Sequence, residues 1–382
     1  MRKVLIVSSL YPTAANPGYG IFVKNCEDGL AENGFVTDHA VIGGSPSGWL
    51  HKLFLYAFFY ARALYKGLFN DYDILYGHFV SHICLPLYLI ALVRKPAMVI
   101  NIHGSDILVE GGIRRFIYSY FLAPLIKKIL RGASLVITPS RQYRKILASK
   151  FGVDGAKIFV SPSGGIDAQK FRALDKNECR RKLGLDEKEF VIGYVSRIEK
   201  NKGWQVLVEA VSDLKKTGAA GNFKALVVGK GSEVNKFKEK VSALGLEKEI
   251  MHIENTVRDE LSTFYSASDI FIFPTLKESL GLVGIEAMAC GAPVIGSRIE
   301  ALGEYLIDGV TGFFFDAGSP SDLSEKITLY YKLSVEKKRK LSDNALKMAV
   351  SFDSKLTAKK LSEKFSTLQA SAPAADRTAK RF

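Results

Sequence analysis

Residues 278–291 read ESLGLVGIEAMACG and combine two glutamates with three glycines. An apolar run at residues 270–273 precedes them and predicts a buried strand. Residues 282–290 have the composition of a short helix, and Gly291 with the nearby Pro293 predicts the end of that helix. The segment therefore predicts a strand, a loop and a helix in direct succession.

The two carboxylates of this segment are predicted to face one small volume. Glu278 falls in the strand-to-helix loop, and Glu286 lies about one turn inside the helix. Because helical side chains tilt toward the helix N-terminus, both face the carboxyl end of the strand. Free backbone N–H groups at Gly281, Leu282 and Val283 would line the same volume, as at helix starts that bind phosphate or sugar oxygens. The pattern suits a ligand with hydroxyls at one end and phosphates at the other.

Apolar, β-branched runs alternate with helical stretches along the whole chain. Near-continuous apolar strands separated by helices predict parallel, doubly wound sheets and the α/β fold class. A crossover between two similar halves is expected around residues 164–171, and a site between two such domains is the simplest consequence, because ligands bind at the carboxyl ends of the strands. The predicted strands are residues 4–8, 38–42, 74–77, 98–102, 135–138 and 158–161, then 191–195, 224–228, 251–253, 270–273, 293–296 and 312–315.

A second charged segment, GYVSRIEKNKG at residues 193–203, also follows a predicted strand. Arg197 and Lys202 flank the turn that opens into a helix at Trp204. The guanidinium offers a planar fork and the ammonium a point charge, which together suit a diphosphate. A solvated charged turn is the plainer alternative.

The Glu-x7-Glu spacing at residues 278–286, with the Ala-Met-Ala-Cys-Gly helix end, closely resembles the signature of retaining GT-B glycosyltransferases, in particular glycosyltransferase family 4 (glycosyl transferases group 1). Residues 193–203 resemble the Gly-Arg-Leu…Lys-Gly element of that family. The resemblance extends from about residue 1 to 365. It implies the GT-B fold, in which two Rossmann-like domains face each other across a cleft.

The resemblance also implies a domain division. Residues 1–165 would form an acceptor domain, and residues 166–365 would form the domain that binds a nucleotide sugar. Residues 366–382 are mostly small or charged and can bury little, so we expect a disordered tail.

Within the second domain, the resemblance assigns roles to individual residues. Arg197 and Lys202 would hold the donor diphosphate and neutralise the charge that develops on it. Glu286 would hold the ribose hydroxyls, and Glu278 would hold sugar hydroxyls and help to place the anomeric carbon. Further donor contacts are expected at the Gly-x-Gly turn and at the place where backbone groups commonly read the base: Gly229, Val257 and Arg258.

Within the first domain, the segment HGSD at residues 103–106 resembles the family element that lies beside the donor sugar. His103 would approach the sugar, and Asp106 would orient the acceptor hydroxyl or act near it. In the loop after the first strand, Gly18 or Gly20 would let the backbone approach the donor diphosphate. His78 and His82 are weaker candidates.

The implied function is that of a retaining hexosyltransferase, which moves a sugar from a nucleoside-diphosphate sugar, such as a UDP-sugar, to an acceptor of polysaccharide biosynthesis. The acceptor would be a lipid-linked or growing cell-surface glycan. No metal and no cofactor is expected. The Asp71-Tyr72-Asp73 run matches the Asp-x-Asp metal pattern, but it precedes a strand and so lies at the end opposite the ligands.

Other function classes stay open beside this one. A nucleotide-sugar epimerase of the same fold would need no acceptor, and a non-catalytic binding protein of the same fold would not need the paired charges. A dinucleotide dehydrogenase is disfavoured, because Val234 replaces the third glycine of Gly-x-Gly-x-x-Gly.

The net charge of +14 is concentrated in the first half of the chain, where residues 1–165 hold 18 Lys and Arg against 9 Asp and Glu. No nucleic-acid motif accompanies this excess. Residues 49–70 and 113–131 are rich in aromatic and basic residues, including Arg114, Arg115, Lys127 and Lys128. These stretches are interpreted either as segments that lie on an anionic membrane surface or as helices that cover the sheet with their cations turned outward.

The four cysteines show no disulfide or metal spacing, and no signal peptide or membrane-spanning run is recognised. These observations lead us to expect a cytoplasmic protein. Under the membrane-surface interpretation of residues 49–70 and 113–131, it would be peripheral on the inner face of the plasma membrane.

Overall fold

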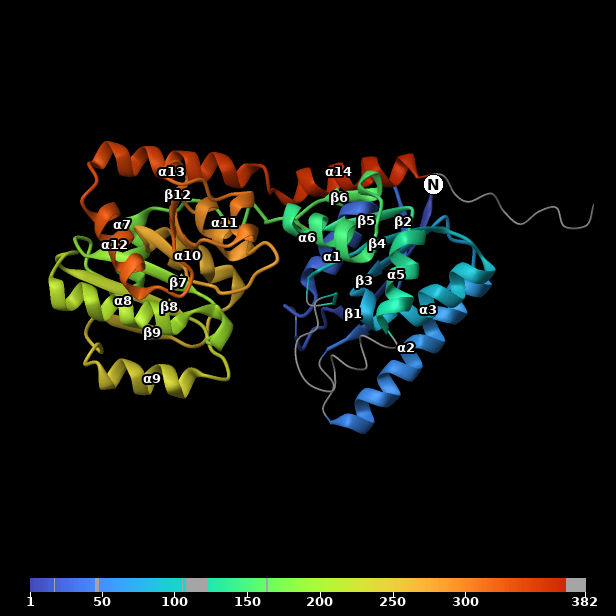
Figure 1. Cartoon of the computed structure of the whole chain (residues 1–382), viewed down its shortest axis with the longest axis horizontal. Coiled ribbons are helices and arrows are strands. Elements are labelled where there is room, and N and C mark those ends of the chain that lie inside the picture. Colours follow the sequence, from blue (N-terminus) through green and yellow to red (C-terminus); the bar gives the residue numbers. More distant parts are fainter. Residues whose placement is uncertain (17, 45–47, 105, 108–121, 163, 369–382) are drawn as a thin grey trace, which may run out of the picture. The chain divides into compact units, whose positions relative to one another are not determined.

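The computed structural model describes residues 1–16, 18–44, 48–104, 106–107, 122–162 and 164–368. The chain forms two compact units, one made of Met1–Gly165 with Ser354–Phe382 and the other of Ile166–Asp353. Each unit is built on a six-stranded parallel sheet with helices on both faces (Figure 1). The predicted α/β class and the two doubly wound sheets are confirmed.

In the first unit the strand order is β2-β1-β3-β4-β5-β6, and every pairing is parallel. The chain order reverses between β1 and β3, so the loops after these two strands part at the carboxyl edge of the sheet. The strands are β1 (Lys3–Tyr11), β2 (Val36–Gly43), β3 (Ile74–His78), β4 (Ala97–Asn101), β5 (Leu135–Thr138) and β6 (Ile158–Val160); the described helices are α1 (Ile21–Glu32), α2 (Trp49–Phe69), α3 (Val80–Val93), α5 (Ala123–Gly132), α6 (Arg141–Ile146) and α14 (Ser354–Thr367).

Two apolar layers enclose this sheet. On one face, α2, α3 and α5 contribute buried residues such as Phe59, Ile83 and Ile126. On the other face, α1 and α14 contribute Val23 and Leu361. Because the strands are covered on both faces, their sequences are apolar throughout rather than alternating.

Helix α14 belongs to the first unit, which corrects the predicted domain boundary at residue 365. Its Phe365 is fully buried and packs edge-on against Tyr76 of β3, with ring centroids 5.0 Å apart. A Cβ on Gly29 of α1 would lie 2.6 Å from the Cβ of Ala358, so α1 and α14 approach closely. The amphipathic pattern of α14 predicts a helix but cannot say which sheet its apolar face covers.

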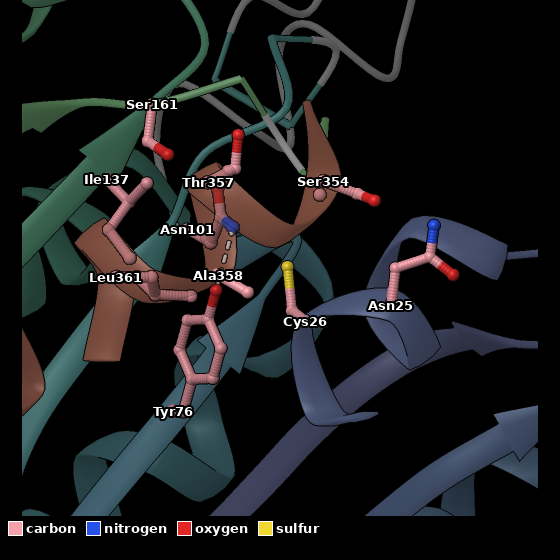
Figure 2. A pocket seen from close by; sticks show the side chains of 11 residues that line it. Asn25, Cys26, Tyr76, Asn101, Ile137, Ser161, Ser354, Thr357, Ala358 and Leu361 are labelled. Atoms are coloured by element: carbon pink, nitrogen blue, oxygen red, sulfur yellow. Dashed lines mark hydrogen bonds between the residues drawn. The ribbon is translucent and has the colours of Figure 1, made fainter. Parts of the chain in front are cut away.

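A small cavity of about 10 Å³ lies where α14 meets α1 and the sheet (Figure 2). Asn101 donates a hydrogen bond from Nδ2 to the Tyr76 hydroxyl at 2.9 Å beside it. A cavity of this size holds about one water molecule. It is therefore a packing feature of the first unit and is far too small for a nucleotide sugar.

In the second unit the strand order is β12-β11-β10-β7-β8-β9, again with parallel pairings throughout. The chain order reverses between β7 and β10. The strands are β7 (Phe190–Val195), β8 (Phe223–Val228), β9 (Ile250–Ile253), β10 (Ile270–Phe273), β11 (Val294–Ser297) and β12 (Gly312–Phe315); the helices are α7 (Lys176–Leu183), α8 (Trp204–Thr217), α9 (Val234–Ala243), α10 (Leu261–Ala267), α11 (Leu282–Ala289), α12 (Pro320–Tyr331) and α13 (Val335–Val350).

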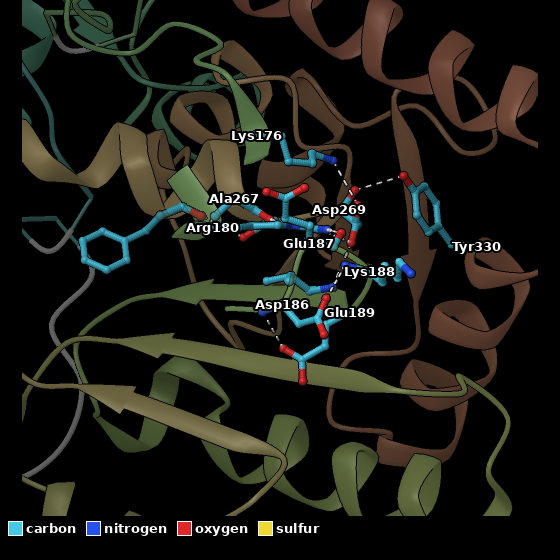
Figure 3. A network of polar contacts seen from close by, with 12 residues as sticks. Lys176, Arg180, Asp186, Glu187, Lys188, Glu189, Ala267, Asp269 and Tyr330 are labelled. Atoms are coloured by element: carbon cyan, nitrogen blue, oxygen red, sulfur yellow. Dashed lines mark hydrogen bonds and ion pairs between the residues drawn. The ribbon is translucent and has the colours of Figure 1, made fainter. Parts of the chain in front are cut away.

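A polar network closes the amino-terminal edge of this second sheet (Figure 3). Asp269, just before β10, pairs with Arg180 at 2.6 Å and with Lys176 at 2.9 Å, and it accepts the Val191 N–H of β7 at 2.8 Å. The Tyr330 hydroxyl of α12 donates to the Asp269 carbonyl at 2.9 Å. The buried Arg180 also donates to the Ala267 carbonyl at 3.0 Å and to the Glu187 carbonyl at 2.6 Å. The network holds α7 and α12 to the edge opposite the carboxyl ends of the strands.

Candidate active site

Four predicted residues meet at the point where the chain order of the second sheet reverses. The loop after β7 carries Arg197 and Lys202, and the loop after β10 carries Glu278 and leads into α11 with Glu286. β7 and β10 are neighbours, and their loops lead to helices on opposite faces of the sheet. Such a switch point leaves room for a ligand at the carboxyl edge of the strands.

An ion pair joins these two loops. The Lys202 Nζ lies 2.8 Å from the Glu278 Oε2, and both side chains are largely buried, with 16% and 18% of their surfaces exposed. The Leu276 N–H also donates to the Asn201 carbonyl at 2.9 Å. A diphosphate bound here would compete with Glu278 for the ammonium and free that carboxylate to accept from hydroxyls.

Gly203 makes the close approach of these loops possible. It precedes α8 with a φ of 72°, and a Cβ at this position would lie 1.9 Å from the Pro274 carbonyl oxygen in the loop after β10. Any side chain would therefore force the two loops apart. The glycine after Lys202 is a geometric requirement of the site.

Arg197 is exposed, and within the described ranges its guanidinium pairs with no carboxylate. Its loop is nevertheless held firmly, because the Ile198 N–H donates to the Lys230 carbonyl at 3.0 Å. Gly229 has a φ of 136°, and a Cβ there would lie 2.0 Å from the Ser196 carbonyl oxygen. The Gly-x-Gly turn thus lets the loop after β8 lie against the loop that presents Arg197.

Glu286 is almost fully buried one turn inside α11. Its Oε2 accepts a hydrogen bond from the Tyr265 hydroxyl at 3.0 Å, and its Oε1 lies 3.0 Å from the Arg258 guanidinium. Burial raises the pKa of the Glu286 carboxyl above its ordinary value of 4.5, although Arg258 and Tyr265 both favour the charged form. Arg258 also lies over the Phe171 ring, 5.6 Å from its centroid. A carboxylate oriented on two sides suits the recognition of paired hydroxyls.

The start of α11 has the conformation that the sequence predicted. Gly281 precedes it with a φ of 86°, and a Cβ there would lie 2.5 Å from the Phe273 ring. The Tyr305 hydroxyl donates to the Gly281 carbonyl at 3.1 Å and holds the turn. Leu282 and Val283 open the helix, where N–H groups have no intrahelical acceptor and can meet an anion.

Val257 and Arg258, the residues expected near the base, follow β9. The Val257 side chain is 62% exposed, and Arg258 opens a short 3-10 helix that ends at Glu260. The structure brings Arg258 to Glu286, whereas Val257 contributes an exposed apolar surface beside it.

In the first unit, His103 forms a pair with His78. The His78 Nδ1 and the His103 Nε2 lie 3.1 Å apart, and their rings are stacked with centroids 5.3 Å apart. The Phe79 ring stacks on His103 with centroids 4.3 Å apart, and the Phe22 ring centroid lies 4.8 Å from that of His103. Burial lowers the pKa of His103 to about 3 and the pKa of His78 well below 6.5, so both rings are neutral and share one N–H. Such a pair orients a ring and fixes its tautomer.

Asp106 is buried and accepts three backbone N–H groups. They belong to His103 at 3.1 Å, Gly104 at 2.9 Å and Val80 at 3.2 Å. Burial raises the pKa of Asp106 to about 6, while these N–H bonds oppose the shift. The geometry favours a positioning role, in which Asp106 joins the loop after β4 to the start of α3, over the expected contact with an acceptor hydroxyl.

The two glycines of the first loop differ. Gly20 precedes α1 with a φ of 72°, and a Cβ there would lie 2.7 Å from the Leu10 carbonyl carbon. A Cβ on Gly18 would meet nothing within 4 Å. Gly20 is therefore the position where the backbone requires glycine.

The remaining polar candidates have structural partners. Asp73 accepts the Lys3 N–H at 2.8 Å, and Asp71 pairs with Arg94. Both lie just before β3, at the amino-terminal edge of the sheet, as the sequence predicted. The His82 Nδ1 lies 2.7 Å from the Ser9 hydroxyl oxygen.

Some predictions fall outside the described residues. These are Ser105 of the HGSD segment, the basic residues Arg114 and Arg115, and the tail from residue 369 onward. Residues 366 and 367 of the predicted tail lie in α14.

Two residues that shape the site were not predicted from the sequence, and a third was ranked too low. Tyr265 holds Glu286, Tyr305 holds the Gly281 turn, and His78, ranked below His103, is its partner. Tyr265 and Tyr305 lie in ordinary helical or loop contexts without a motif. The position of His78 at the end of β3, next to β4, is a signal that could have paired it with His103.

Comparison with known proteins identifies the family. The family model "Glycosyltransferase Family 4" matches residues 20–169, and "Glycosyl transferases group 1" matches residues 175–348, so that together they match most of the chain. Among curated relatives, D-inositol 3-phosphate glycosyltransferase of Paenarthrobacter aurescens (strain TC1) is 29% identical over 207 residues, 54% of this chain and 50% of that protein. The protein of the same name from Rhodococcus opacus (strain B4) is 35% identical over 181 residues, 46% of this chain and 40% of that protein. The chain thus spans about half the length of the curated relatives it matches, or less.

Solved structures agree on the fold. Sucrose-phosphate synthase from Thermosynechococcus elongatus superposes with a TM-score of 0.76 at 20% identity, covering 96% of this chain and 98% of that one. Anabaena Alr3699/HepE, solved with UDP and glucose, superposes with a TM-score of 0.72 at 21% identity, covering 96% and 100%. With both family models and the fold in agreement, the chain is a member of the GT-B glycosyltransferases of family 4, glycosyl transferases group 1.

Proposed function

We propose that the chain is a retaining hexosyltransferase that moves a sugar from a nucleoside-diphosphate sugar to an acceptor. The observation that carries this proposal is the convergence of Arg197, Lys202, Glu278 and Glu286 at the switch point between β7 and β10. Arg197 and Lys202 would recognise a diphosphate, and the two glutamates would recognise hydroxyls. All four lie at the edge of the sheet where the carboxyl ends of the strands meet.

A UDP-sugar is the proposed donor class. The Anabaena protein of the same fold has been solved with UDP and with UDP-glucose, which supports this choice. The start of α11 and Arg197 would bind the diphosphate, and Glu286 would bind the ribose. Glu278 and His103 would contact the sugar, and Gly229, Val257 and Arg258 would border the nucleotide.

The chain's own residues would act on the leaving group rather than as a nucleophile. In the proposed reaction the acceptor hydroxyl attacks the anomeric carbon on the face from which the diphosphate leaves, and the diphosphate oxygen takes the hydroxyl proton. Arg197 and Lys202 would stabilise the negative charge that develops, which is the largest electrostatic contribution available here. The metal-free reaction that the sequence predicted stays part of the proposal.

The proposed acceptor is a lipid-linked or growing cell-surface glycan, met in the cytoplasm at an anionic membrane surface. The relatives named D-inositol 3-phosphate glycosyltransferase suggest a phosphorylated soluble acceptor as the competing class. The excess of Lys and Arg in residues 1–165 is compatible with either kind of anionic acceptor.

Calorimetry tests the donor site. Glu286→Ala should weaken binding of UDP and of UDP-glucose alike, because the ribose contact is common to both. Glu278→Ala should weaken binding of UDP-glucose more than binding of UDP. The opposite pattern would show that the two roles are exchanged, and unchanged binding in both variants would refute the site.

Product analysis separates the enzyme classes. The anomeric configuration of the product, read by NMR, should match that of the donor. Release of an epimerised nucleotide sugar without an acceptor would identify an epimerase instead, and tight binding without turnover toward any acceptor would favour a binding protein.

A further inference from the structure

Helix α2 has an inner face that packs on the sheet and an outer face that is apolar and exposed. Phe59, Ala63 and Gly67 are buried on the inner face. A Cβ on Gly67 would lie 2.5 Å from the Ile90 side chain, so α2 lies directly against α3. The outer residues are 52% to 74% exposed: Trp49, Leu50, Leu53, Phe54, Phe58, Tyr65 and Phe69.

Helix α3 adds a second exposed apolar stripe. It packs between α2 and α5 in the same layer over the sheet. Its exposed residues are spaced by three or four positions or adjoin one another, so they share a face, and they are 38% to 64% exposed: Leu85, Leu89, Leu92 and Val93. The named outer residues of α2 and α3 together are called the α2–α3 surface. An exposed apolar patch on a folded domain marks an interaction site.

The charged side chains on the helices that carry and border the α2–α3 surface have one sign. Residues 49–69, 80–93 and 123–132 contain no Asp or Glu, whereas α2 and α5 together carry six Lys and Arg. Lys128 of α5 donates to the Tyr88 hydroxyl of α3 at 2.8 Å, which brings a cation to the border of the apolar stripe. Lys127 and Arg131 are also exposed on α5. The partner that fits such a surface has an apolar layer beneath a negatively charged layer.

The structure favours the first of the two interpretations of residues 49–70 that the sequence left open. If α2 only covered the sheet, its cations would point outward and its aromatic residues inward. Instead, Lys66 pairs with Asp38 of β2, while Phe54, Phe58 and Phe69 face solvent. Trp, Tyr and Phe with flanking Lys and Arg are the composition of helices that lie in a membrane interface.

We propose that the α2–α3 surface docks into the interface of an anionic lipid bilayer, with α2 lying in the membrane plane. Among the described residues, no helix is both long enough and apolar enough to cross a bilayer, so the contact would be peripheral. The surface would bring the enzyme to a lipid-linked acceptor. Delivery to such an acceptor rests on the proposed function, whereas lipid binding itself does not.

Tryptophan fluorescence and vesicle co-sedimentation test the docking. The chain has two tryptophans, of which Trp49 is exposed on the α2–α3 surface and Trp204 is buried in the second unit. Vesicles of phosphatidylcholine with phosphatidylglycerol should bind the protein and shift the Trp49 emission to the blue. Binding should fall with salt and be weaker to phosphatidylcholine alone. Trp49→Phe should abolish the emission shift.

Matched variants locate the contact. Phe54→Ser with Phe58→Ser should lower the vesicle affinity at least about tenfold, because two aromatic side chains no longer leave water. Val335→Ser with Val350→Ser, on the exposed face of α13 in the second unit, is the control and should bind vesicles as the parent does. Lys127→Gln with Lys128→Gln should weaken binding only to anionic vesicles.

Three results would overturn the proposal. They are failure to bind anionic vesicles at low salt, equal loss in the Val335/Val350 control, and a solution dimer that Phe54→Ser with Phe58→Ser dissociates without any vesicle binding. The last result would assign the surface to a second copy of the chain. A thermal shift with UDP-glucose on the same variants distinguishes failure of lipid docking from failure of the proposed donor site, since the donor site should be intact whether or not lipid binds.

Discussion

At the scale of single residues, Arg197 offers the cleanest test of the diphosphate site. It is exposed and has no carboxylate partner within the described part of the chain, so its removal should leave the fold intact. We expect Arg197→Ala to lower the transfer rate about a hundredfold or more, as for the loss of one transition-state donor. Lys200→Ala, an exposed cation in the same turn, is the control for charge alone. Equal rates in parent and Arg197→Ala, measured with saturating donor, would remove Arg197 from the site.

We expect replacement of the Glu286 carboxylate to raise the stability of the fold and to weaken nucleotide binding. Its pKa is raised in the folded state, so the folded chain holds the proton more tightly than the unfolded chain does. The resulting stabilisation is present below about pH 4.5 and is lost as the pH rises through the folded pKa. Glu286→Gln removes this loss, and its unfolding temperature should exceed that of the parent at pH 7.5 by about 2–4 °C per kcal/mol regained.

The same variant should bind UDP at least about tenfold more weakly, because a charged acceptor has been replaced by a neutral amide. The stability gain should shrink toward zero as the pH falls below 4.5, where the carboxyl becomes neutral in both the folded and the unfolded state. Glu325→Gln, exposed on α12, is the matched control. A gain that persists unchanged at pH 4.5 would contradict the charge argument.

At the scale of elements, α8 begins and ends with a glycine in the left-handed region, and the two ends can be compared directly. Gly203 has a φ of 72° and Gly218 a φ of 63°, but only a Cβ at Gly203 would strike backbone, at the Pro274 carbonyl. Gly218→Ala should cost about 1 kcal/mol for the left-handed conformation alone. Gly203→Ala should cost about 1–3 kcal/mol more, because the loops after β7 and β10 must separate.

Chemical denaturation of both glycine variants checks this difference. The Gly203 variant should also lose donor affinity, since Lys202 and Glu278 are carried by the separated loops. If the two variants were equally stable, the close approach of the loops would not limit the site.

The strands were the most predictable elements, and their accuracy has a physical cause. β5, β10 and β12 occupy the predicted residues. β5 and β10 are buried throughout, and a strand buried on both faces is a short apolar run with clear ends. β12 is a run of three Phe after a Gly, which is bounded as clearly. β1 extends to Tyr11, three residues beyond the prediction, because its pairing with β2 continues past an irregularity. The polarity of that last part resembles a loop.

The site was predictable where motif and topology coincide. Arg197, Lys202 and Glu278 lie in loops that follow strands, and Glu286 lies in the first turns of the helix after such a loop. Their common edge therefore followed from parallel pairing. The Lys202–Glu278 ion pair and the three N–H groups on Asp106 depend on loop conformation. No spacing in the sequence encodes them.

At the scale of the whole molecule, the second unit is an insertion into the first. The Ile166 N–H donates to the Phe352 carbonyl at 2.9 Å, so the two ends of the second unit lie side by side. We expect residues 166–353, produced alone, to unfold cooperatively and to bind UDP. The thermal melt and calorimetry of this fragment are the measurement. A fragment without a cooperative melt would show that the unit is not autonomous.

The first unit should depend on the returning chain. Residues 1–165 alone lack Leu361 and Phe365, which complete the apolar layer over one face of the sheet. They should show no cooperative melt, whereas joining residue 165 to residue 354 through a short Gly-Ser linker should restore one. A cooperative melt of residues 1–165 alone would contradict the role given to α14.

The late position of α14 in the sequence has a consequence for folding during synthesis on the ribosome. The first sheet is translated first, yet the helix that covers its second face is translated about 200 residues later. At about 5–20 residues per second this is an interval on the order of 10–40 s. During that interval one face of the first sheet lacks the part of its cover that α14 supplies, and the inserted unit receives its last residue before α14 is made. The half of the chain that is synthesised first is therefore the half that finishes folding last, and it is the half for which a chaperone would matter.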